Sequence, residues 1–149
     1  NLEKLYLSLK KLNLYDADLN EYYSISHELG IVPKDLNKLQ NKLFGIECNY
    51  EELNGIDFKK GCYVGQENTA RIKLKNKLSK RLLPINIISG ELEISESIYN
   101  NGIEFGKVLI EKEYPFALIK YLDKNFDKNL KFNTSNALIK IQIPNWIKI

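Results

Sequence analysis

Leucines recur three or four residues apart at the start of the chain, at positions 2, 5, 9 and 12, with lysines between them. This period is typical of an amphipathic helix, so we expect one over residues 2–12. Asp18 is placed to cap a second helix over residues 19–29, which Gly30 would end. A shorter helical stretch is expected over residues 33–43. The first part of the chain is therefore expected to be mostly helical.

The pattern changes after residue 80, where short apolar runs rich in β-branched residues replace the helical period. Turn residues separate these runs, which lie at 82–88, 103–110, 116–122 and 137–143. Several short strands at such spacing indicate a small antiparallel barrel or sandwich. Residues 65–77 contain good helix formers and no breaker, so a further helix is expected just before the strands.

The composition excludes some classes of protein but does not indicate a function. The chain has 149 residues, 44% of them hydrophobic, and a formal net charge of +3. It has neither an apolar run of the ~20 residues that a membrane helix needs nor a secretion signal at its start, so we expect a cytoplasmic protein that does not enter membranes. Such a mild charge gives no reason to expect nucleic acid as a direct ligand.

A basic run after residue 70 has two interpretations. The run consists of Arg71, Lys73, Lys75, Lys77, Lys80 and Arg81. The first interpretation is a solvated helix face, which is the usual role of such a run. The second is a contact for an anion such as the carboxylate tail of a small molecule, an acidic protein or an RNA phosphate.

The two cysteines, Cys48 and Cys62, lack the paired spacing of a metal site, and His27 is the only histidine. We expect His27 at the surface or at a helix cap. Glu47 precedes Cys48 and disfavours its thiolate, so Cys48 is interpreted as structural. A metal bound through cysteine would therefore need ligands from another molecule.

Residues 60–67 read Lys-Gly-Cys-Tyr-Val-Gly-Gln-Glu, and we call them the signature. Lys60 lies two residues from Cys62, and a nearby ammonium group favours a thiolate. Gly61 and Gly65 permit unusual backbone angles or a close approach to a ligand. Gln66 and Glu67 could bond the edge of a heterocycle. A buried, unreactive cysteine is the alternative from chemistry alone.

The signature closely resembles that of the YgfZ family of folate-binding proteins, relatives of the glycine-cleavage T-protein. Its flanks are similar too, before it at residues 30–32, Glu47, Asn49 and 54–58, and after it at residues 69–71 and 80–84. The segment after the signature is most similar to the corresponding segment in the branch of the family that includes the mitochondrial iron–sulfur assembly factor. The resemblance implies an α+β fold, the C-terminal part of an aminomethyltransferase-like folate-binding fold that ends in a β-barrel.

The resemblance also implies a function. Family members bind tetrahydrofolate and support the assembly or repair of iron–sulfur clusters, including those of tRNA-modifying enzymes. In the mitochondrial branch the signature cysteine can help to hold a [2Fe–2S] cluster jointly with an A-type assembly protein. On this basis Cys62 is the candidate reactive thiol and cluster ligand. Lys60 would assist it, and the residues expected to shape the loop or contact folate are Gly61, Tyr63, Gly65, Gln66, Glu67 and Arg71.

We divide the chain into residues 1–77, the end of a folate-binding domain with the signature, and residues 78–149, a β-barrel domain. Family members are longer on the N-terminal side, so most of the folate pocket is expected before Asn1. We expect a non-catalytic factor. One alternative is a tetrahydrofolate-dependent aminomethyltransferase, although the signature offers no obvious acid–base group for that chemistry. Another is a module that binds protein or RNA without folate or cluster.

Overall fold

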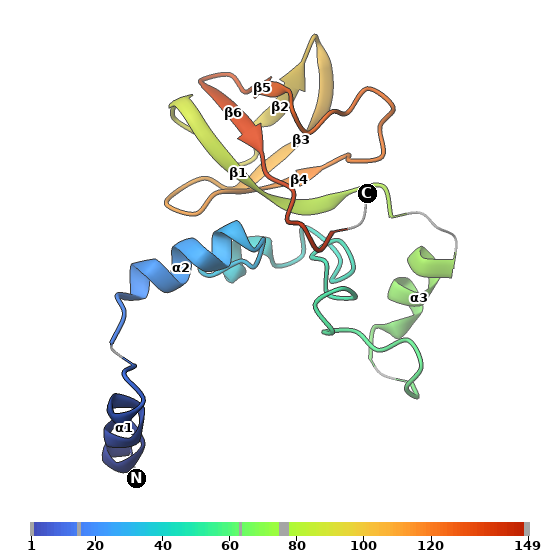
Figure 1. The fold of residues 1–149 in the computed structure, drawn as a ribbon. Helices are drawn as coiled ribbons and strands as arrows, with labels where there is room; N and C mark the ends of the chain where they lie inside the picture. The colour runs from blue at the N-terminus through green and yellow to red at the C-terminus, as the bar shows by residue number, and fades with distance from the viewer. Residues whose placement is uncertain (1, 15, 63, 75–77, 148–149) are drawn as a thin grey trace.

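The computed structural model describes residues 2–14, 16–62, 64–74 and 78–147 (Figure 1). Helical elements precede the strands, as the hydrophobic pattern predicts. In chain order the elements are α1 (Leu2–Lys11), α2 (Leu19–Glu28), the 3-10 helix η1 (Leu36–Leu39), α3 (Gln66–Leu74), β1 (Arg81–Gly90), β2 (Ser97–Asn100), β3 (Ile103–Ile110), β4 (Phe116–Ile119), β5 (Lys131–Asn133) and β6 (Ala137–Ile141).

The strands form a closed antiparallel barrel in the order β1-β4-β3-β2-β5-β6. This confirms the α+β class and the small barrel expected from the sequence. Long β1 bridges two neighbours, pairing with β4 through residues 81–84 and with β6 through residues 85–90. Fully buried side chains from several strands fill the interior, among them Ile85, Phe105 and Phe132. Phe105 meets Phe132 edge-on at 5.4 Å between ring centroids, an arrangement that aromatic pairs favour.

A second hydrophobic cluster covers the outside of β1, β3 and β4. Leu39 from η1 packs there against Leu82, Leu109, Ile110 and Phe116, with Val32, Leu43 and Cys48 at the edge. The segment after α2 is thereby fixed on the barrel. The segment around η1, residues 32–48, is therefore anchored through apolar contacts rather than simply linked by the chain.

His27, on α2, is buried with only 8% of its surface exposed, so the expected surface position is wrong. Its Nε2 lies 2.9 Å from the Pro115 carbonyl oxygen, and its ring meets Phe116 edge-on. Burial lowers the pKa of His27, against the smaller raising effects of the Pro115 hydrogen bond and of Glu28. The neutral ring is therefore the form that the fold favours, and it donates Nε2–H to the carbonyl.

The end of the chain is tied to the end of α2. Trp146 Nε1 donates to the Leu29 carbonyl oxygen at 2.9 Å, and Gln142 Nε2 donates to that of Glu28 at 2.9 Å. Gly30 stops the helix with φ +71°, and a Cβ there would lie 2.5 Å from Pro144. Only glycine satisfies both the backbone angle and this close approach. The helical part and the barrel thus share an interface formed by both chain halves.

By contrast, α1 and α3 stand away from the barrel (Figure 1). No residue of α1 is buried, and the same holds for the described residues of α3. The leucines predicted to form the apolar stripe of α1 face outward. None of the helices in the described ranges has the length and the hydropathy needed to cross a bilayer.

The element boundaries follow the sequence except at two strands and in the stretch after Pro33, where only the four residues of η1 are helical. Asp18 caps α2 by accepting from the Asn20 amide, as predicted. Strands β2 and β5 were not predicted, because each buries a single side chain, Ile98 or Phe132, within a short polar stretch. The helix expected over 65–77 corresponds to α3 up to Leu74, and residues 75–77 lie outside the described ranges. The proposed domain boundary at residue 77 stays a prediction.

Candidate functional site around the signature cysteine

Cys62 is a free and exposed thiol in the loop that leads into α3. An Asx turn orders the approach to this loop, since Asp57 Oδ1 accepts from the Lys59 amide at 2.8 Å. Gly61 and Gly65 face open space, and a Cβ at either position would meet no atom within 4 Å. Gly65 has φ +84°, which turns the chain sharply into the helix. The loop therefore displays the thiol instead of packing it.

The other described signature residues are exposed like Cys62, except Gln66, which is half-buried. Glu67 and Arg71 are both exposed and bond one turn apart on α3, with Arg71 Nη2 donating to Glu67 Oε1 at 2.7 Å. This pair orders the first turns of the signature helix, although exposed pairs of this kind stabilise weakly. Tyr63, predicted to belong to the site, lies outside the described residues. The roles predicted for Lys60 and Gln66 stay predictions.

Cys48 has a different environment. Its side chain lies at the edge of the hydrophobic cluster between η1 and the barrel. Burial, with a smaller effect of the Glu47 carboxylate, raises the pKa of Cys48 to about 11. This agrees with the prediction that Cys48 is structural, because a thiol that stays protonated is a poor nucleophile and metal ligand.

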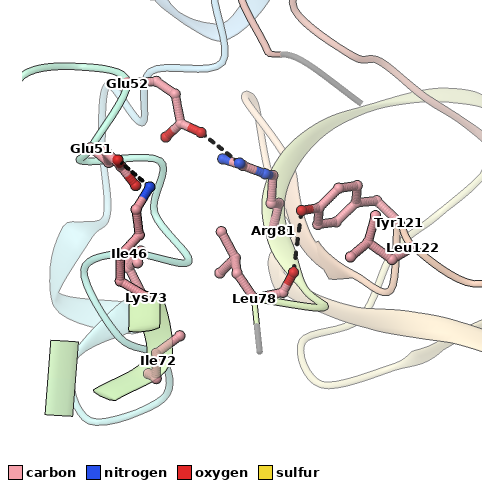
Figure 2. Close-up of a pocket in the computed structure, with 9 residues that line it drawn as sticks. All are labelled: Ile46, Glu51, Glu52, Ile72, Lys73, Leu78, Arg81, Tyr121 and Leu122. Carbon is pink, nitrogen blue, oxygen red and sulfur yellow. Dashed lines mark hydrogen bonds and ion pairs between the residues drawn. The ribbon is translucent and has the colours of Figure 1, made fainter. Parts of the chain in front are cut away.

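A pocket of about 360 Å³ lies between α3 and the barrel (Figure 2). Ile72 and Lys73 come from α3, Arg81 begins β1, and Tyr121 and Leu122 follow β4. Ile46, Glu51, Glu52 and Leu78 complete the lining. The pocket is therefore built from the signature helix, the segment before the signature and the barrel.

Arg81 is the polar centre of this region and is only 7% exposed. One of its Nη atoms lies 2.5 Å from Glu52 Oε1, and the other donates to Asn49 Oδ1 at 2.8 Å. Buried Asn49 in turn donates to the Leu82 carbonyl oxygen at 2.9 Å. Arg81 Nε finds no partner among the described residues. This network fixes the segment just before the signature against the first strand of the barrel.

Lys73 continues the connection to α3. Its ammonium group pairs with Glu51 (Figure 2). The same group lies 5.6 Å from the centre of the Phe58 ring. Adjacent Glu51 and Glu52 thus bond α3 and β1 respectively. The signature helix is positioned through these charged side chains, and the described part of α3 buries no residue that could position it by packing.

The network was not predicted as such from the sequence. Asn49 and Arg81 belong to the flanks that carry the family resemblance, but the basic run was expected to be a solvated helix face. That expectation is wrong for Arg81, which is buried on a strand. Lys75 and Lys77 lie outside the described residues. The alternation of acidic and basic residues gives no sign of which charges meet across 20 to 30 positions of sequence.

A complete metal site is absent from the described residues, which contain no group of three or more His, Cys, Asp or Glu side chains placed to bind an ion. Cys62 could supply one thiolate, while Cys48 is largely protonated. An iron–sulfur cluster needs several such ligands. The arrangement fits a cluster shared with another molecule and does not fit one held by these residues alone.

No protein-family model matches the chain. It is 40% identical over 108 residues to the mitochondrial iron–sulfur cluster assembly factor IBA57 homologue of Neurospora crassa, a match covering 62% of this chain and 25% of that protein. The corresponding Aspergillus oryzae protein is 38% identical over 68 residues, or 46% of this chain and 15% of that protein. The tRNA-modifying protein YgfZ of Aliivibrio fischeri is 29% identical over 155 aligned residues, or 95% of this chain and 46% of that protein.

The chain is homologous to the YgfZ and IBA57 proteins. The matches confirm the predicted resemblance to YgfZ-like proteins and to their mitochondrial branch. The matched regions span less than half the length of each of these relatives. The chain therefore corresponds to a part of the YgfZ-like proteins that it matches.

The prediction of a cytoplasmic location is wrong by this comparison, because the IBA57 homologues are named as mitochondrial proteins. The prediction depended on the lack of a secretion signal near Asn1. Since the chain spans less than half of its YgfZ-like relatives, its first residues carry no information about a targeting segment.

Proposed function

We propose that this YgfZ-like chain acts in the assembly or repair of iron–sulfur clusters, including those of tRNA-modifying enzymes, with Cys62 as the thiol that contacts the cluster. The observation that carries the proposal is the contrast between the two cysteines. Cys62 is exposed in the signature loop, whereas Cys48 is half-buried with a raised pKa. The names of the IBA57 relatives, as iron–sulfur cluster assembly factors, support the same role.

The cluster is a cargo in this proposal and is shared with a partner. One exposed thiolate leaves most of the ligands of a [2Fe–2S] cluster to be supplied from elsewhere. We assign them to an A-type iron–sulfur assembly protein bound at the signature loop. The open space around Gly61 and Gly65 supports this assignment, because it leaves room for a partner's backbone to approach Cys62.

The neighbouring side chains receive supporting roles. Lys60 would assist Cys62 at the cluster, and Gln66 with Tyr63 would contact the partner. The Glu67–Arg71 pair would hold the first turns of α3 in place behind the loop. Beyond the signature, the Lys73–Glu51 and Arg81–Glu52 pairs would set its position relative to the barrel.

Tetrahydrofolate does not fit these residues by themselves. A ligand of that size is normally enclosed over most of its surface. The signature glycines instead face open space. The pocket beside α3 is lined by Ile72 and Lys73 of that helix, and none of the described signature residues lines it. Folate binding would need other parts of a YgfZ-like protein, so no folate-dependent step is assigned to these side chains.

The test compares two cysteine variants. The protein is mixed with an A-type partner carrying a [2Fe–2S] cluster, and the cluster absorbance that coelutes with the complex is measured by gel filtration. Cys62→Ser should abolish this absorbance, while Cys48→Ser, checked by circular dichroism for an intact fold, should retain it. Equal losses in the two folded variants would refute the assignment of Cys62.

A further inference from the structure

We infer that the barrel carries a binding site for an oxyanion of the phosphate class on its outer surface, at β6, β1 and the loop before β5, away from the signature. A hollow of about 380 Å³ lies there. The side chains around it are two lysines, three amides and two isoleucines: Lys128, Lys140, Asn86, Asn129, Gln142, Ile141 and Ile143. No carboxylate lines it.

The register of the sheet concentrates positive charge beside this hollow. Lys140 on β6 lies directly opposite Lys131 on β5, and opposite Asn86 on its other side, on β1. Side chains directly opposite in an antiparallel pair are about 5 Å apart at Cβ, and like charges in this position destabilise a sheet. A barrel that keeps two lysines opposite each other has a charge arrangement that a bound anion would relieve.

These lysines are not neutralised within the described part of the chain. No hydrogen bond or ion pair there involves the ammonium group of Lys128, Lys131 or Lys140, whereas Lys34, Lys38 and Lys120 elsewhere in the structure all bond carboxylates. The nearby carboxylate of Asp127 is engaged by Asn129, whose amide N and Nδ2 donate to Oδ1 at 2.8 Å and 3.0 Å.

The amides are held in place to complete the site. Asn86 Nδ2 donates to Gln142 Oε1 at 3.1 Å, and Gln142 Nε2 donates to the Glu28 carbonyl oxygen at 2.9 Å. Each side-chain amide has a second N–H that these bonds do not use. Two ammonium groups and several N–H donors around one hollow match the acceptor oxygens of a phosphate group.

Two sources share this chemistry, a free phosphate compound and the backbone of a nucleic acid, and the experiment distinguishes them. Thermal unfolding of the protein is followed by circular dichroism in inorganic phosphate and in chloride at matched ionic strength. Binding of a fluorescent RNA oligonucleotide is measured by anisotropy at two salt concentrations. Phosphate should raise the unfolding midpoint above that in chloride.

The variants are Lys128→Gln and Lys140→Gln, with Lys107→Gln on β3, on the opposite side of the barrel, as the matched control. Each of the first two should weaken phosphate binding about ten-fold, as loss of a charge-assisted hydrogen bond does. Lys140→Gln should also leave the midpoint in chloride unchanged or higher, because it removes the repulsion with Lys131.

RNA binding that weakens in Lys140→Gln and loses about one unit of salt slope would identify a nucleic acid backbone as the source. A phosphate response without RNA binding would identify a free phosphate compound. The inference is overturned if neither probe responds, or if Lys107→Gln reduces the response as much as Lys140→Gln does.

Discussion

The barrel and the signature segment, residues 57–74, differ in how much of their side-chain surface they bury. The barrel closes on itself and buries aromatic and aliphatic side chains from every strand. The signature segment buries almost nothing: Val64 is fully exposed, Cys62 is exposed, and the described residues of α3 are partly or fully exposed. One region is stabilised by packing, and the other is positioned by a few charged contacts.

The difference shows how an exposed thiol can be displayed without weakening the fold. Because packing stability comes from the barrel and from its contacts with α2 and η1, the signature loop can present its thiol at little cost to the rest of the molecule. The Arg81–Glu52 and Lys73–Glu51 pairs form the boundary between the two regions. Substitutions in the barrel should therefore change the free energy of unfolding, whereas substitutions in the signature loop should change the reactivity of its thiol.

The largest effect is expected inside the barrel. Phe132→Ala removes a fully buried ring that contacts Phe105 and Phe126, and should lower the free energy of unfolding by about 3–5 kcal/mol. Val64→Ala, in the signature, should change it by less than about 0.5 kcal/mol. Urea unfolding followed by circular dichroism measures both. A loss of similar size in Val64→Ala would mean that the signature packs against the protein.

The next effect is expected at the boundary. Arg81→Gln leaves the Glu52 carboxylate without its partner and removes the bond to Asn49, at a cost of about 3 kcal/mol to the free energy of unfolding. Arg71→Gln breaks only the exposed pair with Glu67 and should cost about 0.5 kcal/mol at most. If the two variants unfold at the same urea concentration, Arg81 does not hold the boundary.

The third comparison is between the thiols. At pH 8 a thiol with a pKa of about 11 is ionised in roughly one molecule in a thousand. We expect Cys62 to react with a disulfide reagent at least about 100-fold faster than Cys48. Cys62 is exposed to the reagent, whereas Cys48 is half-buried and almost fully protonated. Stopped-flow absorbance should show a fast phase that Cys62→Ser removes and Cys48→Ser keeps. A single phase for both thiols would contradict the distinction between the two regions.

The smallest effect concerns pH. The pKa of His27 is lowered by burial from its ordinary value of 6.5, so the unfolded chain binds the proton more tightly than the native protein does. The stabilisation from neutral His27 should be complete above pH 6.5 and fall as the pH drops below it. We expect a loss of about 1 kcal/mol by pH 5.5, because one pH unit below the unfolded pKa corresponds to at most about 1.4 kcal/mol of linked proton binding. Urea unfolding at pH 8 and pH 5.5 measures it, and His27→Gln should flatten the dependence.

The absence of other histidines makes this last measurement specific, since His27 is the only one in the chain. An unchanged pH dependence in His27→Gln would show that other groups, such as carboxylates, account for the slope. The same measurement reports on the interface between α2 and the barrel, because His27 contacts Pro115 and Phe116 there.

The sequence alone determined the order of helices and strands, the barrel and the family, because these depend on local periodicity and on an eight-residue motif that a single segment contains. The adjacent Glu47 led to the prediction that Cys48 is structural, and in the structure burial raises the pKa of Cys48 more than Glu47 does. It did not find β2 and β5, whose polar sequences bury one residue each, nor the buried position of His27.

Only the tertiary structure decided which charges meet. Arg81 bonds Glu52 and Asn49 across about 30 residues, and Lys131 lies opposite Lys140 because of strand register. Pairing of this kind depends on how closed sheets and turns bring distant residues together, and no local pattern encodes it. The exposure of Cys62 was likewise decided by the fold, since the same thiol would be inert if the loop were packed against the barrel.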